Sequence, residues 1–176
     1  MLLNMRLGLR VVPTSSAVCQ LCGEPLDPFG DHPTCCRKTN LTARHNGLAG
    51  ALGRVLTAAG LSVTPEVRVR GKLRPADLMI TGWSWPKRDA VDLTVVNPMA
   101  EFDNPKANKK VALAEEAKHR KYDTLCAAEN VNMNALGFSV LGGAGPETQK
   151  FLASLRERLL QAHGETEGKQ LAREAL

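Results

Sequence analysis

The stretch that decides the fold reads VTPEVRV at residues 63–69, LRPADLMI at residues 73–80 and AVDLTVV at residues 90–96. In the first and third runs, apolar and β-branched residues alternate with polar ones, which predicts half-buried strands. Gly71-Lys72 predicts a turn after the first run, and Asn97-Pro98 ends the third. The three runs therefore predict three consecutive strands.

Helical patterns flank these strands on both sides. Upstream, Asn40 is a good N-cap, and apolar residues then recur at helical spacing as far as Gly60. Downstream, the pattern predicts a helix over 108–129, a short strand over 136–141 and a helix over 147–162. The order helix, three strands, helix, strand, helix predicts an α/β fold with a mixed central sheet and helices on its faces.

The chain has 176 residues, which is the size of one domain with a small appendage. We divide it into an N-terminal extension (1–18), a cysteine-rich knuckle (19–37), a core (38–162) and a polar C-terminal tail (163–176). No apolar run approaches the roughly 20 residues that a membrane span needs, so no membrane partner is expected.

Four of the five cysteines lie within 18 residues of one another, which predicts a metal site. Cys19 and Cys22 form a C-x-x-C pair, and His32 and Cys36 supply two more ligands for a structural Cys3His zinc site. Cys35 is the alternative fourth ligand. An odd cysteine count fits a set of disulfides poorly. The competing interpretation is a group of reduced structural cysteines.

The charge balance indicates an anionic partner. Lys and Arg number 23 against 18 Asp and Glu, and no acidic residue occurs between positions 37 and 65. Aromatic residues make up only 4% of the chain, which disfavours an extended stacking surface for single strands. We expect nucleic-acid phosphates to contact these basic residues: Arg37, Lys38, Arg44, Lys109 and Lys110.

Two aspartates lie on or beside the predicted strands. Asp77 closes the run Arg74-Pro-Ala-Asp, and Asp92 shares one face of its strand with Thr94. Strands two and three are neighbours along the chain, so the two carboxylates could meet and bind Mg²⁺ or Mn²⁺ between them. An aspartate beside a proline is also common in turns, and one on a strand can simply face solvent.

The helix that follows is rich in lysine. Residues 106–122 contain six basic and two acidic side chains. A lysine from this helix could reach the two carboxylates and stabilise negative charge in a transition state. Alone, such a helix is more often a solvated face.

Together these motifs resemble the restriction-enzyme-like endonuclease of site-specific non-LTR retrotransposons. In that family a Cys-Cys-His-Cys knuckle precedes a nuclease core of the PD-(D/E)XK superfamily. The resemblance spans roughly residues 19–160 and rests on Cys19-x-x-Cys22, Asp31-His32-x-x-x-Cys36, Arg44-His45-Asn46, Glu66, Arg74-Pro-Ala-Asp77, Asp92-Leu-Thr-Val and Lys118-His-Arg-Lys121-Tyr122.

The resemblance implies roles for these residues. Asp77 matches the first metal-binding aspartate, Asp92 the second acidic position, and Glu66 an additional acidic residue found upstream in some members. The superfamily lysine that follows the second acid is replaced by Thr94 in this chain. Ala76 also separates the proline from Asp77, where the family has Pro-Asp.

In these retroelement enzymes the lysine is thought to come from the following helix. The resemblance therefore assigns that role to Lys118, with Lys121 as the alternative, while Tyr122 packs against or orients the lysine.

The expected function is an Mg²⁺- or Mn²⁺-dependent endonuclease acting on double-stranded DNA, in or beside a retroelement polypeptide that carries a reverse transcriptase. The expected location is intracellular, at DNA, and nuclear in a eukaryote. Two alternatives remain. One is a catalytically inactive, zinc-stabilised nucleic-acid-binding module, and the other is a protein–protein adaptor that docks through the knuckle.

Overall fold

The computed structural model of the chain describes residues 9–12, 17–65, 76–97 and 107–175. Within them, helices and strands follow one another in the order predicted for the core, preceded by one short helix in the knuckle. These elements are α2 (Asp31–Cys35), α3 (Leu41–Ala58), β1 (Ser62–Pro65), β2 (Leu78–Thr81), β3 (Arg88–Val96), α4 (Ala107–Ala128), β4 (Val131–Ser139) and α5 (Pro146–Ala175).

The four strands form one mixed sheet in the order β1-β2-β3-β4. The first three strands are antiparallel neighbours, with Ser62 opposite Thr81 and Leu78 opposite Val91. β3 and β4 are parallel along nine residues each and are joined through α4. The prediction of an α/β fold with a mixed sheet is confirmed.

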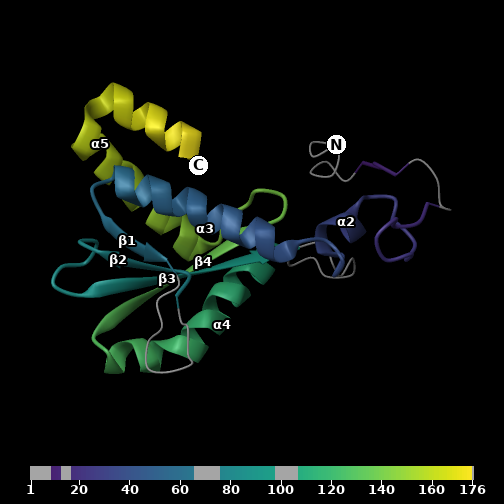
Figure 1. The fold of residues 1–176 in the computed structure, drawn as a ribbon, viewed down its shortest axis with the longest axis horizontal. Helices are drawn as coiled ribbons and strands as arrows, with labels where there is room; N and C mark the ends of the chain where they lie inside the picture. The colour runs from purple at the N-terminus through teal and green to yellow at the C-terminus, as the bar shows by residue number, and fades with distance from the viewer. Residues whose placement is uncertain (1–8, 13–16, 66–75, 98–106, 176) are drawn as a thin grey trace.

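Helices cover both faces of the sheet, as Figure 1 shows with α3 and α5 on one side and α4 on the other. The larger core lies under α3 and α5 and includes Leu56, Leu155 and Leu159 from the helices, with Ile80 and Leu93 from the sheet. A smaller core joins α4 to the opposite face. It contains Ala76, Met79, Ala90, Tyr122, Cys126 and Val131.

The strand boundaries differ from the predicted ones in two places. The predicted strand residues 66–69 and 73–75 lie outside the described part of the chain. β3 begins two residues earlier than predicted, at Arg88. β4 begins at Val131, five residues before the predicted start. The prediction missed this start because Asn132 and Asn134 are polar residues. In the structure both belong to the strand, and their side chains contact the buried Asp89.

The predicted end of the last helix at Ala162 lies next to a kink, beyond which the chain is helical again as far as Ala175. Gly164 interrupts the helix with φ 77° and ψ 176°, and Figure 1 shows the chain folding back over α3 beyond it. Nε2 of His163 donates to the carbonyl of Ala58, 2.7 Å away, and Leu171 packs against the larger core. The tail is polar in composition but is tied down by these contacts. None of the helices in the described residues combines the length and hydropathy that a membrane span requires.

Candidate functional site

The knuckle gathers four metal-ligand side chains at one point. The ligand atoms of Cys19, Cys22, His32 and Cys36 all lie within 4.8 Å of one another. The sulfurs of Cys19 and Cys36 are 3.9 Å apart. Two thiolates of a tetrahedral zinc site, with Zn–S bonds near 2.3 Å, stand about 3.8 Å apart. The cluster therefore has the composition and the spacing to hold a zinc ion.

Cys36, and not Cys35, is the fourth member of this cluster. His32 lies in α2 and Cys36 is its C-cap, and the amide of Cys36 donates to the carbonyl of His32, which brings the two residues together. The Cys35 side chain is exposed, and its sulfur lies 3.4 Å from the carbonyl oxygen of Asp31. The structure therefore decides between the two alternatives that the spacing left open.

Backbone hydrogen bonds shape the knuckle around the ligands. The amide of Gly23 donates to the carbonyl of Cys19 as the chain turns after the first ligand pair, and Gly23 has the positive φ (79°) that this turn requires. Asp27 accepts from the amides of Phe29 and His32 and so fixes the start of α2. The amides of Leu21 and Cys22 lower the pKa of Cys19 to about 6, which favours the thiolate that binds metals.

Thr34, which lies between two of the ligands, connects the knuckle to the core. Nη1 of Arg44 in α3 donates to the Thr34 carbonyl at 3.1 Å. Nδ2 of Asn97, just after β3, donates to the Thr34 hydroxyl at 2.8 Å. Knuckle and sheet are thus held together at the end of the sheet where β3 ends.

The two predicted aspartates meet at the open end of the β2–β3 ladder. Leu78 pairs with Val91, so Asp77 and Asp92 are the next residues on their strands. The amide of Asp77 donates to the carbonyl of Val91 at 2.9 Å, which keeps Asp77 in line with β3. The insertion of Ala76 before Asp77 therefore leaves the two acidic residues side by side.

Asp77 is held by two groups. Its Oδ2 accepts a hydrogen bond from the amide of Leu93 at 2.6 Å and lies 3.2 Å from Nε2 of His45 in α3. The same Nε2 is 3.3 Å from the carbonyl oxygen of Leu93, which can only accept, so Nε2 carries the proton. His45 was not among the predicted site residues. It belongs to the resemblance only within the Arg44-His45-Asn46 motif and without a role, and only the packing of α3 on β3 reveals its contact.

Asp92 is 5% exposed, and Nζ of Lys118 in α4 lies 2.6 Å from its Oδ2. This 2.6 Å contact is an ion pair to a buried oxygen that accepts no other hydrogen bond from the described residues. Burial raises the pKa of Asp92, Lys118 opposes the rise, and the neighbouring Asp77 adds to it. Two carboxylates and one lysine from three elements therefore share one site.

The alternative lysine, Lys121, lies elsewhere. Its side chain is exposed, and its Nζ sits 4.6 Å from the centre of the Tyr122 ring. Contact with Tyr122 raises the pKa of Lys121. Between the two candidate lysines, the structure brings only Lys118 to the aspartates. The fifth predicted member, Glu66, lies outside the described residues.

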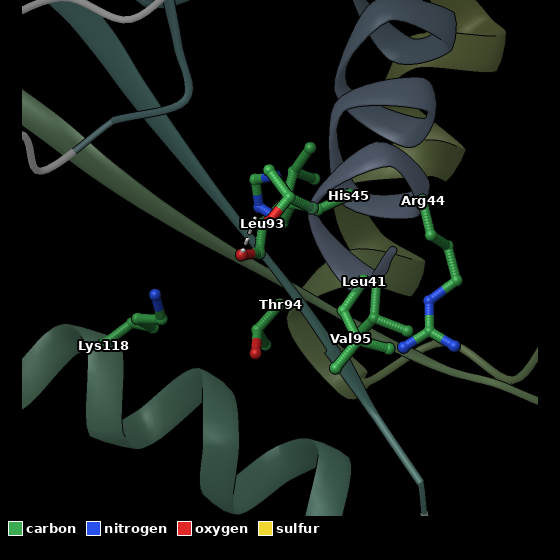
Figure 2. A pocket seen from close by; sticks show the side chains of 8 residues that line it. Leu41, Arg44, His45, Leu93, Thr94, Val95 and Lys118 are labelled. Carbon is green, nitrogen blue, oxygen red and sulfur yellow. Dashed lines mark hydrogen bonds between the residues drawn. The ribbon is translucent and has the colours of Figure 1, made fainter. Parts of the chain in front are cut away.

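A hollow of about 410 Å³ lies beside this group, between α3, β3 and α4. Figure 2 shows Lys118 entering from α4, Thr94 rising from β3 and His45 facing them from α3. Arg44 extends from the far side of α3, away from Lys118. The hollow is lined by Leu41, Leu93 and Val95 as well as by hydroxyl and cationic side chains, and Lys118 connects it to the acidic pair.

Of the five basic residues expected to contact phosphates, four are exposed: Arg37, Lys38, Arg44 and Lys109. Lys110 is half-buried. The first three follow the knuckle into the start of α3, whereas the two lysines occupy the first turn of α4. The basic residues thus lie on two elements that flank the hollow.

A second group of polar residues, which the sequence did not reveal, fixes α4 against α5 and β4. The buried carboxylate of Glu115 accepts hydrogen bonds from the amides of Gly137, Glu147 and Thr148, and so caps the start of α5. One turn further on, His119 lies between two carboxylates. Its Nδ1 is 2.7 Å from Asp123 and its Nε2 is 2.6 Å from Glu147. Lys118 lies between these two anchors in the sequence, so they determine where it points.

No protein-family model matches this chain, and no curated protein is detectably similar to it in sequence.

Proposed function

We propose that this protein is a divalent-metal-dependent endonuclease that hydrolyses phosphodiester bonds in double-stranded DNA. The observation that carries the proposal is the convergence of Asp77, Asp92 and Lys118 beside an open hollow. The order of strands and helices around this site supports it, because it is the order expected for a restriction-endonuclease-like core.

The residues present suit a hard divalent cation. Asp92 offers a buried carboxylate oxygen whose polar contact among the described residues is the ion pair with Lys118, and Asp77 is the next carboxylate across the ladder. Oxygen ligands of this kind, completed by water and phosphate, are those that Mg²⁺ and Mn²⁺ prefer. The two carboxylates would hold the ion, which when bound polarises the scissile phosphate and lowers the pKa of a coordinated water.

The chain's own groups would do the rest. Lys118 would leave Asp92 when a phosphate enters and stabilise the negative charge that develops on it. His45 would act as a positioning residue, because it holds Asp77 against the Leu93 backbone and touches no reacting atom. Arg37, Lys38, Arg44, Lys109 and Lys110 would bind backbone phosphates with little dependence on base sequence. The knuckle, with zinc at Cys19, Cys22, His32 and Cys36, would place the duplex.

The test is nicking of supercoiled plasmid DNA by the full-length protein with Mg²⁺ or Mn²⁺. We expect Asp77→Asn and Asp92→Asn to abolish nicking. Lys118→Ala should reduce it by about 10²–10³-fold, as removal of one charge-stabilising group does. Lys121→Ala is the matched control, because it removes an exposed lysine one turn away on the same helix. Equal nicking by wild type and the aspartate variants, or equal losses in both lysine variants, would refute the assignment.

A second candidate is a zinc-stabilised nucleic-acid-binding module without catalysis. The direct contact between Lys118 and Asp92 favours it, because the lysine occupies the oxygen that a metal ion would use. This candidate predicts salt-sensitive DNA binding with no nicking under any metal, so the plasmid assay separates the two.

A further inference from the structure

The loop that joins β2 to β3 carries two tryptophans in opposite environments. Trp83 stacks on Phe151 of α5 with 4.4 Å between ring centroids, and the guanidinium of Arg158 lies 4.9 Å from its ring. Trp85, two residues further on, is 79% exposed. Exposed tryptophan is uncommon, because leaving so large an apolar surface in water is unfavourable. The loop, which we call the hairpin tip (residues 82–88), lies at the left edge of Figure 1.

Hydrogen bonds to neighbouring buried groups fix the conformation of the hairpin tip. The buried carboxylate of Asp89 accepts hydrogen bonds from the amide and the hydroxyl of Ser84, each at 3.0 Å. The amide of Lys87 donates to the carbonyl of Ser84, and Nη2 of Arg158 donates to that of Trp83 at 2.7 Å. Trp85 is thus presented to solvent by an ordered support, so little conformational entropy is lost when it meets a flat partner.

The charge around Trp85 is positive. Lys87 and Arg88 are both exposed, and no acidic residue occurs from Leu78 to Arg88. Asp89 itself is 1% exposed and directs its carboxylate to Ser84, Asn132 and Asn134. An indole ring beside two cations is complementary to a nucleic-acid base beside its phosphates.

We propose that Trp85 stacks on one unpaired base of a bound nucleic acid, while Lys87 and Arg88 contact the phosphates beside it. This inference rests on the nucleic-acid partner of the proposed function, but it does not depend on cleavage. Arg88 lies four positions before Asp92 on β3, about 13 Å along a strand, so the hairpin tip and the acidic pair occupy separate places on the same strand.

The chain has two tryptophans, so Trp83→Phe leaves Trp85 as the sole indole fluorophore. This variant is titrated, without added divalent metal, with a duplex that carries one unpaired nucleotide and with the same duplex fully paired. We expect the unpaired base to quench Trp85 emission. The difference between wild type and Trp85→Phe gives the same signal without altering Trp83. Trp85→Ala should weaken binding to the duplex with the unpaired base by about 5- to 150-fold, the range for one base–aromatic stack, and leave binding to the paired duplex nearly unchanged.

The outcomes separate this inference from the proposed function. Unchanged Trp85 emission while DNA binding is detected by anisotropy would overturn the inference, as would equal binding of both duplexes by Trp85→Ala and wild type. Self-association that Trp85→Ala abolishes, without quenching by DNA, would assign the hairpin tip to a second copy of the chain and also overturn it. Quenching by the unpaired base in a protein that never nicks plasmid DNA would support the stacking contact and refute the nuclease.

Discussion

At the scale of single residues, the adjacent cysteines Cys35 and Cys36 differ in burial and in the groups that they contact. Cys36 is 3% exposed and faces Cys19 inside the knuckle, whereas Cys35 is exposed and contacts only carbonyl oxygens of its own helix. Cys36 is the C-cap of α2, with φ −57° and ψ 124°, and its sulfur lies in the cluster, whereas the sulfur of Cys35 lies beside the carbonyl oxygens of Asp31 and His32. The candidate metal site thus includes only one cysteine of the adjacent pair.

The first residue-scale prediction follows from this difference. Cys36→Ser should lose the single zinc ion per chain that we expect in the wild type, and Cys35→Ser should keep it. A structural zinc ion contributes on the order of 10 kcal/mol to a small site in apparent terms, so the knuckle of Cys36→Ser should also unfold. Zinc content by elemental analysis and protease sensitivity near residues 19–36 measure both effects. Equal zinc in the two serine variants would contradict the Cys3His assignment.

At the scale of elements, α4 is the part that the candidate site depends on. Glu115 connects its middle to the start of α5, and the space around that carboxylate is closely filled, since a Cβ on Gly145 would collide with Oε1 of Glu115. His119 ties the next turn to Glu147, whose other carboxylate oxygen accepts from the amide of Ala135 in β4. Helix, sheet and neighbouring helix are joined through these groups, and Lys118 gains a defined direction.

The element-scale prediction concerns pH. Carboxylates only accept, so His119 between Asp123 and Glu147 must be doubly protonated. Burial opposes protonation, but the hydrogen bonds to Glu147 and Asp123 outweigh it and raise the pKa of His119 above 6.5. A raised histidine pKa gives stability that is complete below the unfolded value near 6.5 and is lost as pH rises through the folded value. The free energy of unfolding should therefore fall as pH rises above 6.5, by no more than about 1 kcal/mol for so partly exposed a pair.

Urea unfolding at several pH values between 5 and 9 measures this dependence. His119→Gln should flatten it. His163→Gln is the comparison, because Nε2 of His163 donates to the carbonyl of Ala58 and its Nδ1 lies 3.8 Å from Glu167, a longer carboxylate contact than either of those made by His119. A profile that stays steep in His119→Gln, or one that flattens equally in His163→Gln, would assign the pH dependence to other groups.

At the scale of the whole molecule, positive charge is unevenly distributed. Residues 147–176 hold five basic and five acidic side chains, so the entire excess of five charges lies in the first 146 residues. Within that part, the knuckle, α3 and α4 carry the basic residues that flank the acidic pair. The net charge of +5 is therefore not spread evenly, because basic residues surround the two aspartates.

This distribution predicts which substitutions alter the salt dependence of DNA binding. Removing Arg37 and Lys38 together should reduce the slope of log K against log salt concentration by about 0.9 for each lost phosphate contact. Lys150→Ala with Arg156→Ala removes two exposed charges of α5 and should leave the slope unchanged. Fluorescence anisotropy with one duplex between 50 and 300 mM salt measures both. A matched fall in slope for the two double variants would mean that DNA also contacts α5.

The sequence predicted the parts of the fold that rest on local patterns. The Asn40 cap, the end of α3 before Gly60 and the β-branched run of β3 each carry their signal within a few residues, and each is confirmed. The zinc set and the meeting of Asp77 with Asp92 were also accessible, since one follows from ligand spacing and the other from adjacency of strands two and three.

What the sequence could not reveal depends on contacts between distant segments. His45 and Leu93 are 48 positions apart, and Glu115 and Thr148 are 33 apart, so neither pairing leaves a local pattern. Glu115 reads as a solvated partner for the helix lysines, yet it is buried and satisfied by backbone amides. The sequence also does not distinguish the environments of Trp83 and Trp85, because the difference arises from the packing of α5 against Trp83.

The order of pairing in the sheet has a consequence for how the site forms in time. β1, β2 and β3 pair as sequential neighbours, whereas the β3–β4 ladder closes only after the chain has passed through α4. Contacts of short sequence separation generally form with less loss of chain entropy than distant ones. We therefore expect the two aspartates to come together early in folding and to repel one another until α4 docks. Docking of α4 would bring Lys118 to the two aspartates and relieve that repulsion. The site would therefore be completed in the same late step in which α4 docks.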